Sequence, residues 1–167
     1  MEISAAQIKA LREKTNAGVM DCKRALAEAG GDQEKAALIL RERGLTMAEK
    51  KAHRSTEQGL VECYIHAGGR IGAMVEVNCE TDFVARTDAF RALVRELAMQ
   101  VAAIGPLAVS EEDLPPDAEG PVEETCLLKQ PYIRDSSRSV QDIVNDVIAK
   151  TGENVRVRRF ARFELGN

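Results

Sequence analysis

The side chains best suited to covalent chemistry or metal binding are few in this sequence. There are two histidines, His53 and His66, and the four cysteines show no CxxC spacing. Cys63 and His66 lie three apart in an expected strand, where side chains alternate between faces, so they point to opposite sides and cannot share one metal ion. We interpret all four cysteines as small buried apolar residues: Cys22, Cys63, Cys79 and Cys126.

Motifs that cradle phosphates or activate a nucleophile are also missing. The sequence contains neither GxxxxGK[ST] nor GxGxxG, and these are the loops that bind phosphate groups. No histidine lies near a serine or cysteine motif that would indicate a base and its nucleophile. The sequence therefore predicts a protein that binds another protein and changes its state, with no covalent chemistry, cofactor or metal.

Composition narrows the class of partner. The chain has 167 residues, of which 44% are apolar and 30% charged, as in globular proteins. Its net charge is −4, which disfavours a dedicated nucleic-acid binder. No apolar run approaches the roughly 18–20 residues that span a bilayer, and the first residues lack a secretory signal. We expect a cytoplasmic protein that contacts neither membrane nor nucleic acid directly.

Residues 1–45 predict three short helices packed as a bundle. Ser4 and Gln7 form a capping box at the first helix. The second helix, from about residue 19 to 29, has inward positions at helical spacing. Asp32 caps the third helix, which is expected to end at Gly44. Residues 46–58 have no apolar periodicity and are interpreted as a polar tether, helical in part at most.

Residues 59–167 predict an α+β module. Segments 60–66 and 71–79 alternate with period two around a hairpin turn, and a third strand follows at 155–165. Amphipathic helices are expected at 87–104 and after Ser139, which with Asp142 forms a second capping box. The predicted fold is an antiparallel three-stranded sheet covered by these helices, with an acidic, proline-rich, solvated loop at 106–125.

The alternation also predicts which strand residues share a face. In the first strand Val61, Cys63 and Ile65 are expected on the same face as Val75 and its neighbours at alternate positions of the second strand. In the third strand one face is expected to hold Val155, Val157, Ala161, Phe163 and Leu165. The other face would then present Phe160 among arginines and could pair with a second copy.

Two segments could bind a partner. In 78–86, Thr81 could cap a helical turn with Asp82 in its first turn, and Phe83 would project from the strand–helix junction. Residue type alone favours Phe83 in the core. In 156–162, arginines alternate with an aromatic residue, which would suit an RNA-binding sheet; a solvated edge strand is the interpretation we prefer.

Three segments resemble elongation factor Ts in order and spacing. They are Thr15-Asn-Ala-Gly-Val-Met-Asp-Cys-Lys-Arg-Ala-Leu26, Asn78-Cys-Glu-Thr-Asp-Phe-Val-Ala-Arg86 and Arg159-Phe-Ala-Arg-Phe-Glu-Leu-Gly166. The first two together are highly specific, and the likeness extends from Ile3 to Gly166. The resemblance implies a ubiquitin-associated type of bundle at 1–45 that docks on elongation factor Tu.

The resemblance also implies a function and its residues. That function is guanine nucleotide exchange on elongation factor Tu, in its GDP-bound and nucleotide-free forms, during translation elongation. Docking contacts would fall on Val19, Met20 and Lys23. The exchange motif would fall on Thr81, Asp82, Phe83 and Val84. In the family this phenylalanine inserts beside the partner's magnesium site, and displacement of Mg²⁺ loosens GDP.

The chain has room for only one sheet module and therefore resembles the short members of the family, which act as homodimers. Because the last strand has no cysteine, the expected homodimer would be held non-covalently. The helical insertion usual in the family is replaced by the 106–125 loop. Two alternatives remain from the residues: an adaptor of the ubiquitin-associated type without enzymatic activity, and an RNA-binding sheet module.

Overall fold

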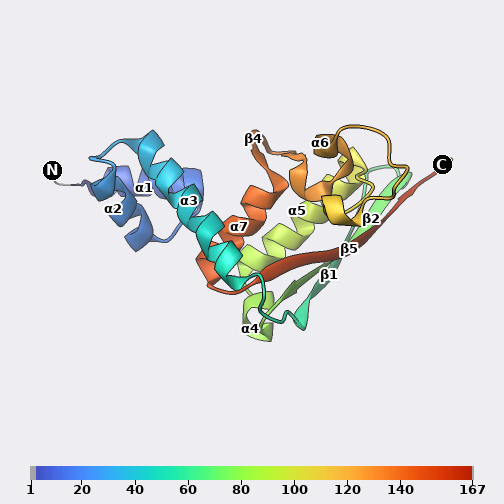
Figure 1. Cartoon of the computed structure of the whole chain (residues 1–167), viewed down its shortest axis with the longest axis horizontal. Helices are drawn as coiled ribbons and strands as arrows, with labels where there is room; N and C mark the ends of the chain where they lie inside the picture. The colour runs from blue at the N-terminus through green and yellow to red at the C-terminus, as the bar shows by residue number, and fades with distance from the viewer. Residues whose placement is uncertain (1–2, 167) are drawn as a thin grey trace. The chain divides into compact units, whose positions relative to one another are not determined.

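The computed structural model describes residues 3–166 and begins with three helices (Figure 1). They are α1 (Ala5–Thr15), α2 (Val19–Glu28) and α3 (Gln33–Lys51). Ser4 caps α1 through the predicted capping box, because its side chain accepts from the Gln7 amide while the Gln7 side chain accepts from the Ser4 amide. Asp32 caps α3 by accepting from two amides of its first turn. The predicted helix starts are confirmed.

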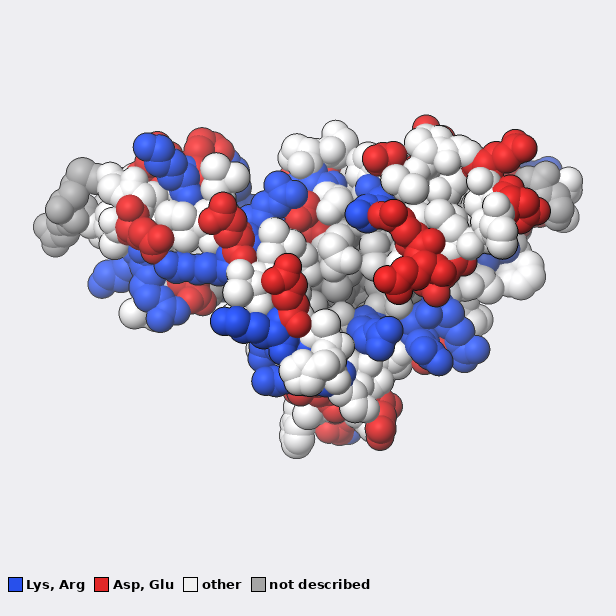
Figure 2. Space-filling model, in the orientation of Figure 1, with Lys and Arg blue, Asp and Glu red and all other residues white. Residues whose placement is uncertain are grey.

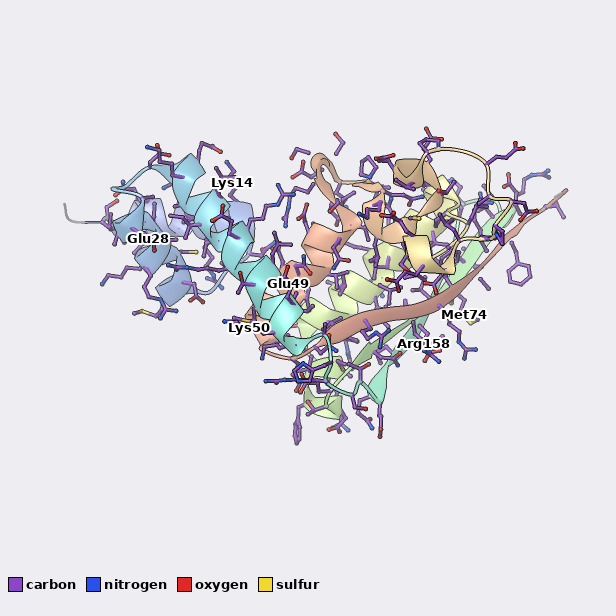
Figure 3. The ribbon with its side chains drawn as sticks, in the orientation of Figure 1. Lys14, Glu28, Glu49, Lys50, Met74 and Arg158 are labelled. Carbon is purple, nitrogen blue, oxygen red and sulfur yellow. The ribbon has the colours of Figure 1, made fainter. Side chains whose placement is uncertain are left out.

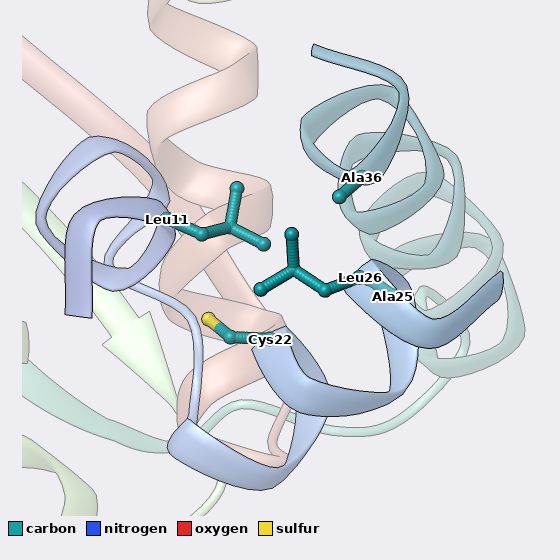
Figure 4. Packing of buried hydrophobic residues seen from close by; sticks show 5 residues of the cluster. All are labelled: Leu11, Cys22, Ala25, Leu26 and Ala36. Carbon is teal, nitrogen blue, oxygen red and sulfur yellow. The ribbon is translucent and has the colours of Figure 1, made fainter. Parts of the chain in front are cut away.

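The bundle is held together by a small apolar cluster. Figure 4 shows Leu11, Cys22 and Leu26 pointing toward one another between the three helices, with Ala25 and Ala36 beside them. All five are fully buried, and burial raises the pKa of the Cys22 thiol. Small residues at Ala25 and Ala36 let the helices approach closely. A core this small stabilises a three-helix bundle only modestly.

The third helix is longer than the sequence predicts. It does not end at Gly44 but continues through it to Lys51, so the first six residues of the expected tether are helical. Gly44 is buried, and a Cβ there would lie 3.9 Å from the Asn145 carbonyl oxygen and 4.0 Å from the Ala149 Cβ. Tertiary packing against the second half of α7 (Val140–Thr151) therefore overrides the local stop signal of the glycine.

The predicted three-stranded antiparallel sheet follows, and its strand order is β1-β2-β5. Its strands are β1 (Gln58–Ile65), β2 (Ile71–Cys79) and β5 (Val155–Glu164). The helix α5 (Asp88–Ile104), capped by Thr87, covers one face of the sheet with a fully buried stripe that includes Phe90 and Val94. We call this covered side the inner face and the opposite side the outer face. The fold is α+β.

The strand register corrects the predicted faces of β1. Leu60 pairs with Val77, and Glu62 pairs with Val75, so Leu60 and Glu62 share the inner face with these buried valines. Val61, Cys63 and Ile65 therefore lie on the outer face and are exposed. The prediction for these three residues is wrong because both faces of β1 carry apolar residues, and alternation alone cannot say which face is buried.

A bulge corrects the predicted faces of β5. The register with β2 shifts between Glu76 and Val77, where an additional residue of β5 is accommodated. Before the bulge, Val155 and Val157 pair with inner-face residues; after it, Phe160 pairs with buried Val75 and is itself half-buried. Ala161, Phe163 and Leu165 are turned to the outer face. A bulge changes the face of every residue beyond it, which strict alternation misses.

The segment between α5 and α7 is more structured than the predicted solvated loop. It contains η1 (Glu111–Asp113), α6 (Val122–Thr125), η2 (Leu127–Lys129) and a hairpin of β3 (Pro131–Tyr132) and β4 (Asp135–Ser139). Ala108 and Val109 are buried, and the Leu107 amide donates to the Thr125 carbonyl at 2.8 Å. The middle of the segment is exposed, as predicted, but its two ends are folded against each other.

The hairpin is fixed to α5 by buried amides. The Gln100 side chain donates to Gln130 and to the Pro131 carbonyl, both at 3.1 Å, and accepts from the Ile133 amide at 2.9 Å. Gln130 in turn donates to the Glu124 carbonyl at 2.7 Å. Each of these bonds satisfies a polar group that would be costly to bury alone, and together they anchor 124–133 to the helix.

The chain divides into two units. The first contains the residues through His53 together with Asn145–Glu153, and the second contains Arg54–Val144 and the residues from Asn154 onward. Helix α7, which begins at the predicted capping box of Ser139 and Asp142, contributes residues to both. Whether residues 1–45 act as a separate docking domain stays a prediction.

Candidate partner-binding site

The segment that follows β2 forms one short, well-capped turn, α4 (Asp82–Ala85). The Thr81 side chain accepts from the Val84 amide at 3.4 Å, as predicted for a cap. Asp82 lies in the first turn and receives the Arg86 guanidinium at 2.7 Å. Val84 and Ala85 are buried, so the turn is held on its sheet side by apolar packing and at its start by a side-chain cap.

Phe83 projects from this turn into solvent. It is 78% exposed, the most exposed of the large apolar residues within the described part of the chain. The expectation from residue type alone, a core phenylalanine, is therefore wrong, and the outward position implied by the family resemblance is the one observed. A phenylalanine that stays exposed on a capped turn gains nothing from folding and is available for a partner.

A second exposed surface lies on α2. Gly18 precedes the helix, and Val19, Met20 and Lys23 are all exposed, Met20 at 63%. The opposite side of the same helix carries the buried Cys22 and Leu26. Helical spacing thus separates the core residues from the predicted docking residues. This surface belongs to the first unit and α4 to the second, and the roles of both stay predictions.

A third surface is the outer face of the sheet, whose apolar residues differ from those predicted from the sequence. Its large apolar residues are all more than half exposed, and Figure 3 shows Met74 extending from the sheet on the side away from α5. Phe163, at 74% exposure, faces Gly72 across the strands, and Ile65 lies against the same glycine. We call this set the outer apolar band: Val61, Ile65, Met74, Phe163 and Leu165. The bulge in β5 is what brings Phe163 to this face.

One end of the outer face is polar. Arg159 donates to Glu76 at 2.7 Å, and Asn78 donates to the same carboxylate at 3.3 Å. The hydrogen bond from Arg159, followed by the one from Asn78, lowers the pKa of Glu76. Exposed Cys63 lies beside the outer apolar band, which corrects the expectation that all four cysteines are buried. A thiol is therefore present on this face although the last strand has none.

The remaining charged surface is uneven. Figure 2 shows acidic side chains gathered over the part of the second unit that holds η1 and its loop, and basic side chains over β5. Residues 3–166 contain no group of three His, Cys, Asp or Glu side chains placed to hold a metal ion. Among the described helices, none is both long and apolar enough to pass through a bilayer.

Exposed apolar residues on rigid, capped elements are typical of proteins that bind other proteins. Comparisons with known proteins show the family. The sequence profile of the family described as Elongation factor TS matches residues 7–121. Elongation factor Ts of Caldanaerobacter subterraneus subsp. tengcongensis is 52% identical, covering 98% of this chain and 97% of that protein. That of Thermotoga petrophila is 49% identical, covering 99% and 98%.

Elongation factor Ts of Desulforamulus reducens is 49% identical over 99% of this chain and 90% of its own length. The chain belongs to the elongation factor Ts family, whose members act in translation elongation. The alignment with the Caldanaerobacter protein extends over 194 positions although this chain has only 167 residues. That relative therefore carries residues this chain lacks, consistent with a shortened segment here.

Proposed function

We propose that this chain is a guanine nucleotide exchange factor for elongation factor Tu. It binds the GDP complex, displaces Mg²⁺ and promotes release of GDP, without covalent chemistry. The observation that carries the proposal is Phe83, held 78% exposed on a turn capped by Thr81 and anchored by buried Val84. Membership of the elongation factor Ts family supports the choice of partner.

The physical basis is the charge of the nucleotide. A divalent cation neutralises the phosphates of GDP, so a protein that displaces the cation removes a large share of nucleotide affinity. Phe83 supplies apolar surface that becomes favourable only when it is buried in the partner. If the pocket that receives it opens only in the nucleotide-free state, the binding energy of Phe83 favours that state.

Linkage gives the experiment that tests this function. Coupling between two ligands of one protein is reciprocal. The factor by which this chain weakens the binding of GDP to elongation factor Tu must therefore equal the factor by which GDP weakens the binding of the chain. We expect the Kd of the chain for nucleotide-free elongation factor Tu to be at least ~10-fold below that for the GDP complex, measured by calorimetry. Equal affinities for the two states would contradict an exchange role.

The exposed residues of α2 are proposed to supply docking. Met20→Asp places a charge where an apolar contact is expected and should weaken binding to elongation factor Tu by about 10-fold or more. Lys23→Glu reverses a charge on the same surface and should weaken binding to elongation factor Tu by a smaller factor. Because both positions are exposed, the melting temperature should not change. Binding is measured by calorimetry on the full chain.

Leu38→Asp is the matched control for Met20→Asp, since Leu38 is an exposed apolar residue of the same unit, on α3. It should leave affinity for elongation factor Tu near the wild-type value. If Met20→Asp and Leu38→Asp lowered affinity equally, α2 would not be the docking surface.

We also propose that the chain forms a homodimer through the outer apolar band. Five large apolar side chains on one sheet face form a surface larger than the scattered apolar residues of ordinary monomers. A second copy offers the same surface, as a two-fold pairing requires. The Glu76–Arg159 ion pair reduces the electrostatic cost of covering the polar end, because its two charges are already paired.

A further inference from the structure

A part-buried polar network lies directly behind the turn that presents Phe83. The Glu80 carboxylate, immediately before Thr81, accepts from the Asn154 backbone amide at 2.6 Å. The same carboxylate oxygen receives the Arg54 guanidinium at 3.5 Å. The Asn154 side chain completes the network by donating to the Arg54 carbonyl at 2.9 Å. Three segments that are far apart in sequence thus meet at Glu80.

Two of its three residues are sheltered from solvent, whereas the Arg54 side chain is 46% exposed. Asn154 is only 2% exposed, and the Glu80 side chain is half-buried, at 22% exposure. An acceptor removed from such a site leaves the Asn154 amide with a lost hydrogen bond in partly dry surroundings, which costs more than breaking an exposed pair. The short bond from the Asn154 amide therefore restrains the position of the Glu80 carboxylate.

The position of Glu80 is transmitted to α4 over a short path. The next residue, Thr81, is the cap of α4, and its carbonyl also accepts from the Cys79 thiol at 3.2 Å. Glu80 is therefore held between a thiol-anchored strand end and a capped turn. Rotation of the backbone at Glu80 would redirect the whole four-residue turn, and with it Phe83, although no bond of the network touches Phe83 itself.

We propose that Glu80, through Asn154 and Arg54, is a positioning residue that sets the direction in which α4 presents Phe83. The inference rests on the proposed function, since the direction of Phe83 matters only if Phe83 inserts into a partner. Glu80 makes no contact with GDP in this scheme. Its effect is on the orientation of the inserting residue, and small errors of orientation are costly when a group must enter a preformed pocket.

Two substitutions separate positioning from general stability. Glu80→Ala removes the acceptor for both Asn154 and Arg54. Glu80→Gln keeps a carbonyl oxygen that can accept the same hydrogen bonds. It should therefore restore much of the GDP release rate and of the order of α4. Glu96→Ala is the matched control, because Glu96 is a similarly half-buried carboxylate that bonds Tyr132 and Arg134 in the same unit, away from α4.

The first measurement is GDP release from elongation factor Tu as a function of chain concentration. For Glu80→Ala we expect the maximal release rate to fall about 10-fold, while the concentration for half-maximal rate changes less than about twofold, because docking through α2 is unaffected. Glu80→Gln should recover to within about threefold of wild type. A Glu80→Ala rate no lower than that of Glu96→Ala would overturn the inference.

The second measurement needs no partner. Hydrogen exchange of the amides of Val84 to Thr87 in the free chain reports the order of α4. It should be faster in Glu80→Ala, near wild type in Glu80→Gln, and unchanged in Glu96→Ala. Unchanged hydrogen exchange in Glu80→Ala would refute the positioning role, whatever the GDP release rate. Failure of the wild-type chain to release GDP would instead refute the proposed function. Faster hydrogen exchange in Glu80→Ala would in that case still support the structural role of Glu80.

Discussion

Replacing Phe83 with alanine should abolish most of the exchange activity and leave the fold intact. Phe83 is 78% exposed, and substitutions of exposed residues mostly change the free energy of unfolding by no more than about 0.5 kcal/mol. In the complex, the same side chain is expected to be buried in the partner, and truncation removes that contact. GDP release should therefore fall far more, about 100-fold, than affinity for the partner, because α2 still docks.

Two controls make this result decisive. Phe90→Ala truncates a phenylalanine of α5 that is fully buried, and should cost ~3–5 kcal/mol of stability. Leu107→Ala truncates another exposed apolar residue of the same unit and should change neither stability nor exchange. Thermal melting and GDP release are measured on each variant. If Phe83→Ala lowered the melting temperature as Phe90→Ala does, with activity falling in proportion, Phe83 would be a packing residue.

Placing a charge in the outer apolar band should convert the homodimer into monomers. Phe163 pairs with Gly72 across the strands and is exposed, so Phe163→Asp should leave the single chain folded. In a dimer, the introduced carboxylate would be buried against the second copy of the chain, with neither an opposite charge nor water beside it. An unpaired buried charge costs several kcal/mol, enough to shift dissociation by a factor of 100 or more.

Light scattering at micromolar concentration measures this directly. We expect wild type near twice the single-chain mass of 18.3 kDa and Phe163→Asp near 18.3 kDa. Leu107→Asp, which carries the same charge change at an exposed site outside the band, should remain dimeric. A reducing agent is included so that exposed Cys63 forms no cross-link. A wild-type mass of 18.3 kDa would contradict the proposed dimer.

The element order could be predicted from the sequence because local signals agree with one another. Capping residues at Ser4, Asp32 and Ser139 define the starts of three helices, and each is used as predicted. The three strands followed from alternation and from the hairpin turn between 65 and 71. These signals lie within a few residues of one another, so no tertiary information is needed to interpret them.

Strand faces and the helix end could not be predicted, since they depend on contacts between distant segments. The sequence does not reveal the bulge opposite Glu76 and Val77. This bulge nevertheless decides that Phe163, and not Phe160, faces outward. Gly44 is a stop signal locally but lies inside α3 because it packs on α7. The outward position of Phe83 could likewise be predicted only through the family resemblance, because the residue type alone predicts burial.

The most direct test of the account is release of a fluorescent GDP analogue from elongation factor Tu, followed by stopped flow with excess unlabelled GDP. Adding the chain should raise the release rate by several orders of magnitude and in a concentration-dependent manner, at constant Mg²⁺. The chain should emerge chemically unchanged and act at substoichiometric amounts. A release rate that stays at the spontaneous value at saturating chain would contradict the exchange function proposed for this protein.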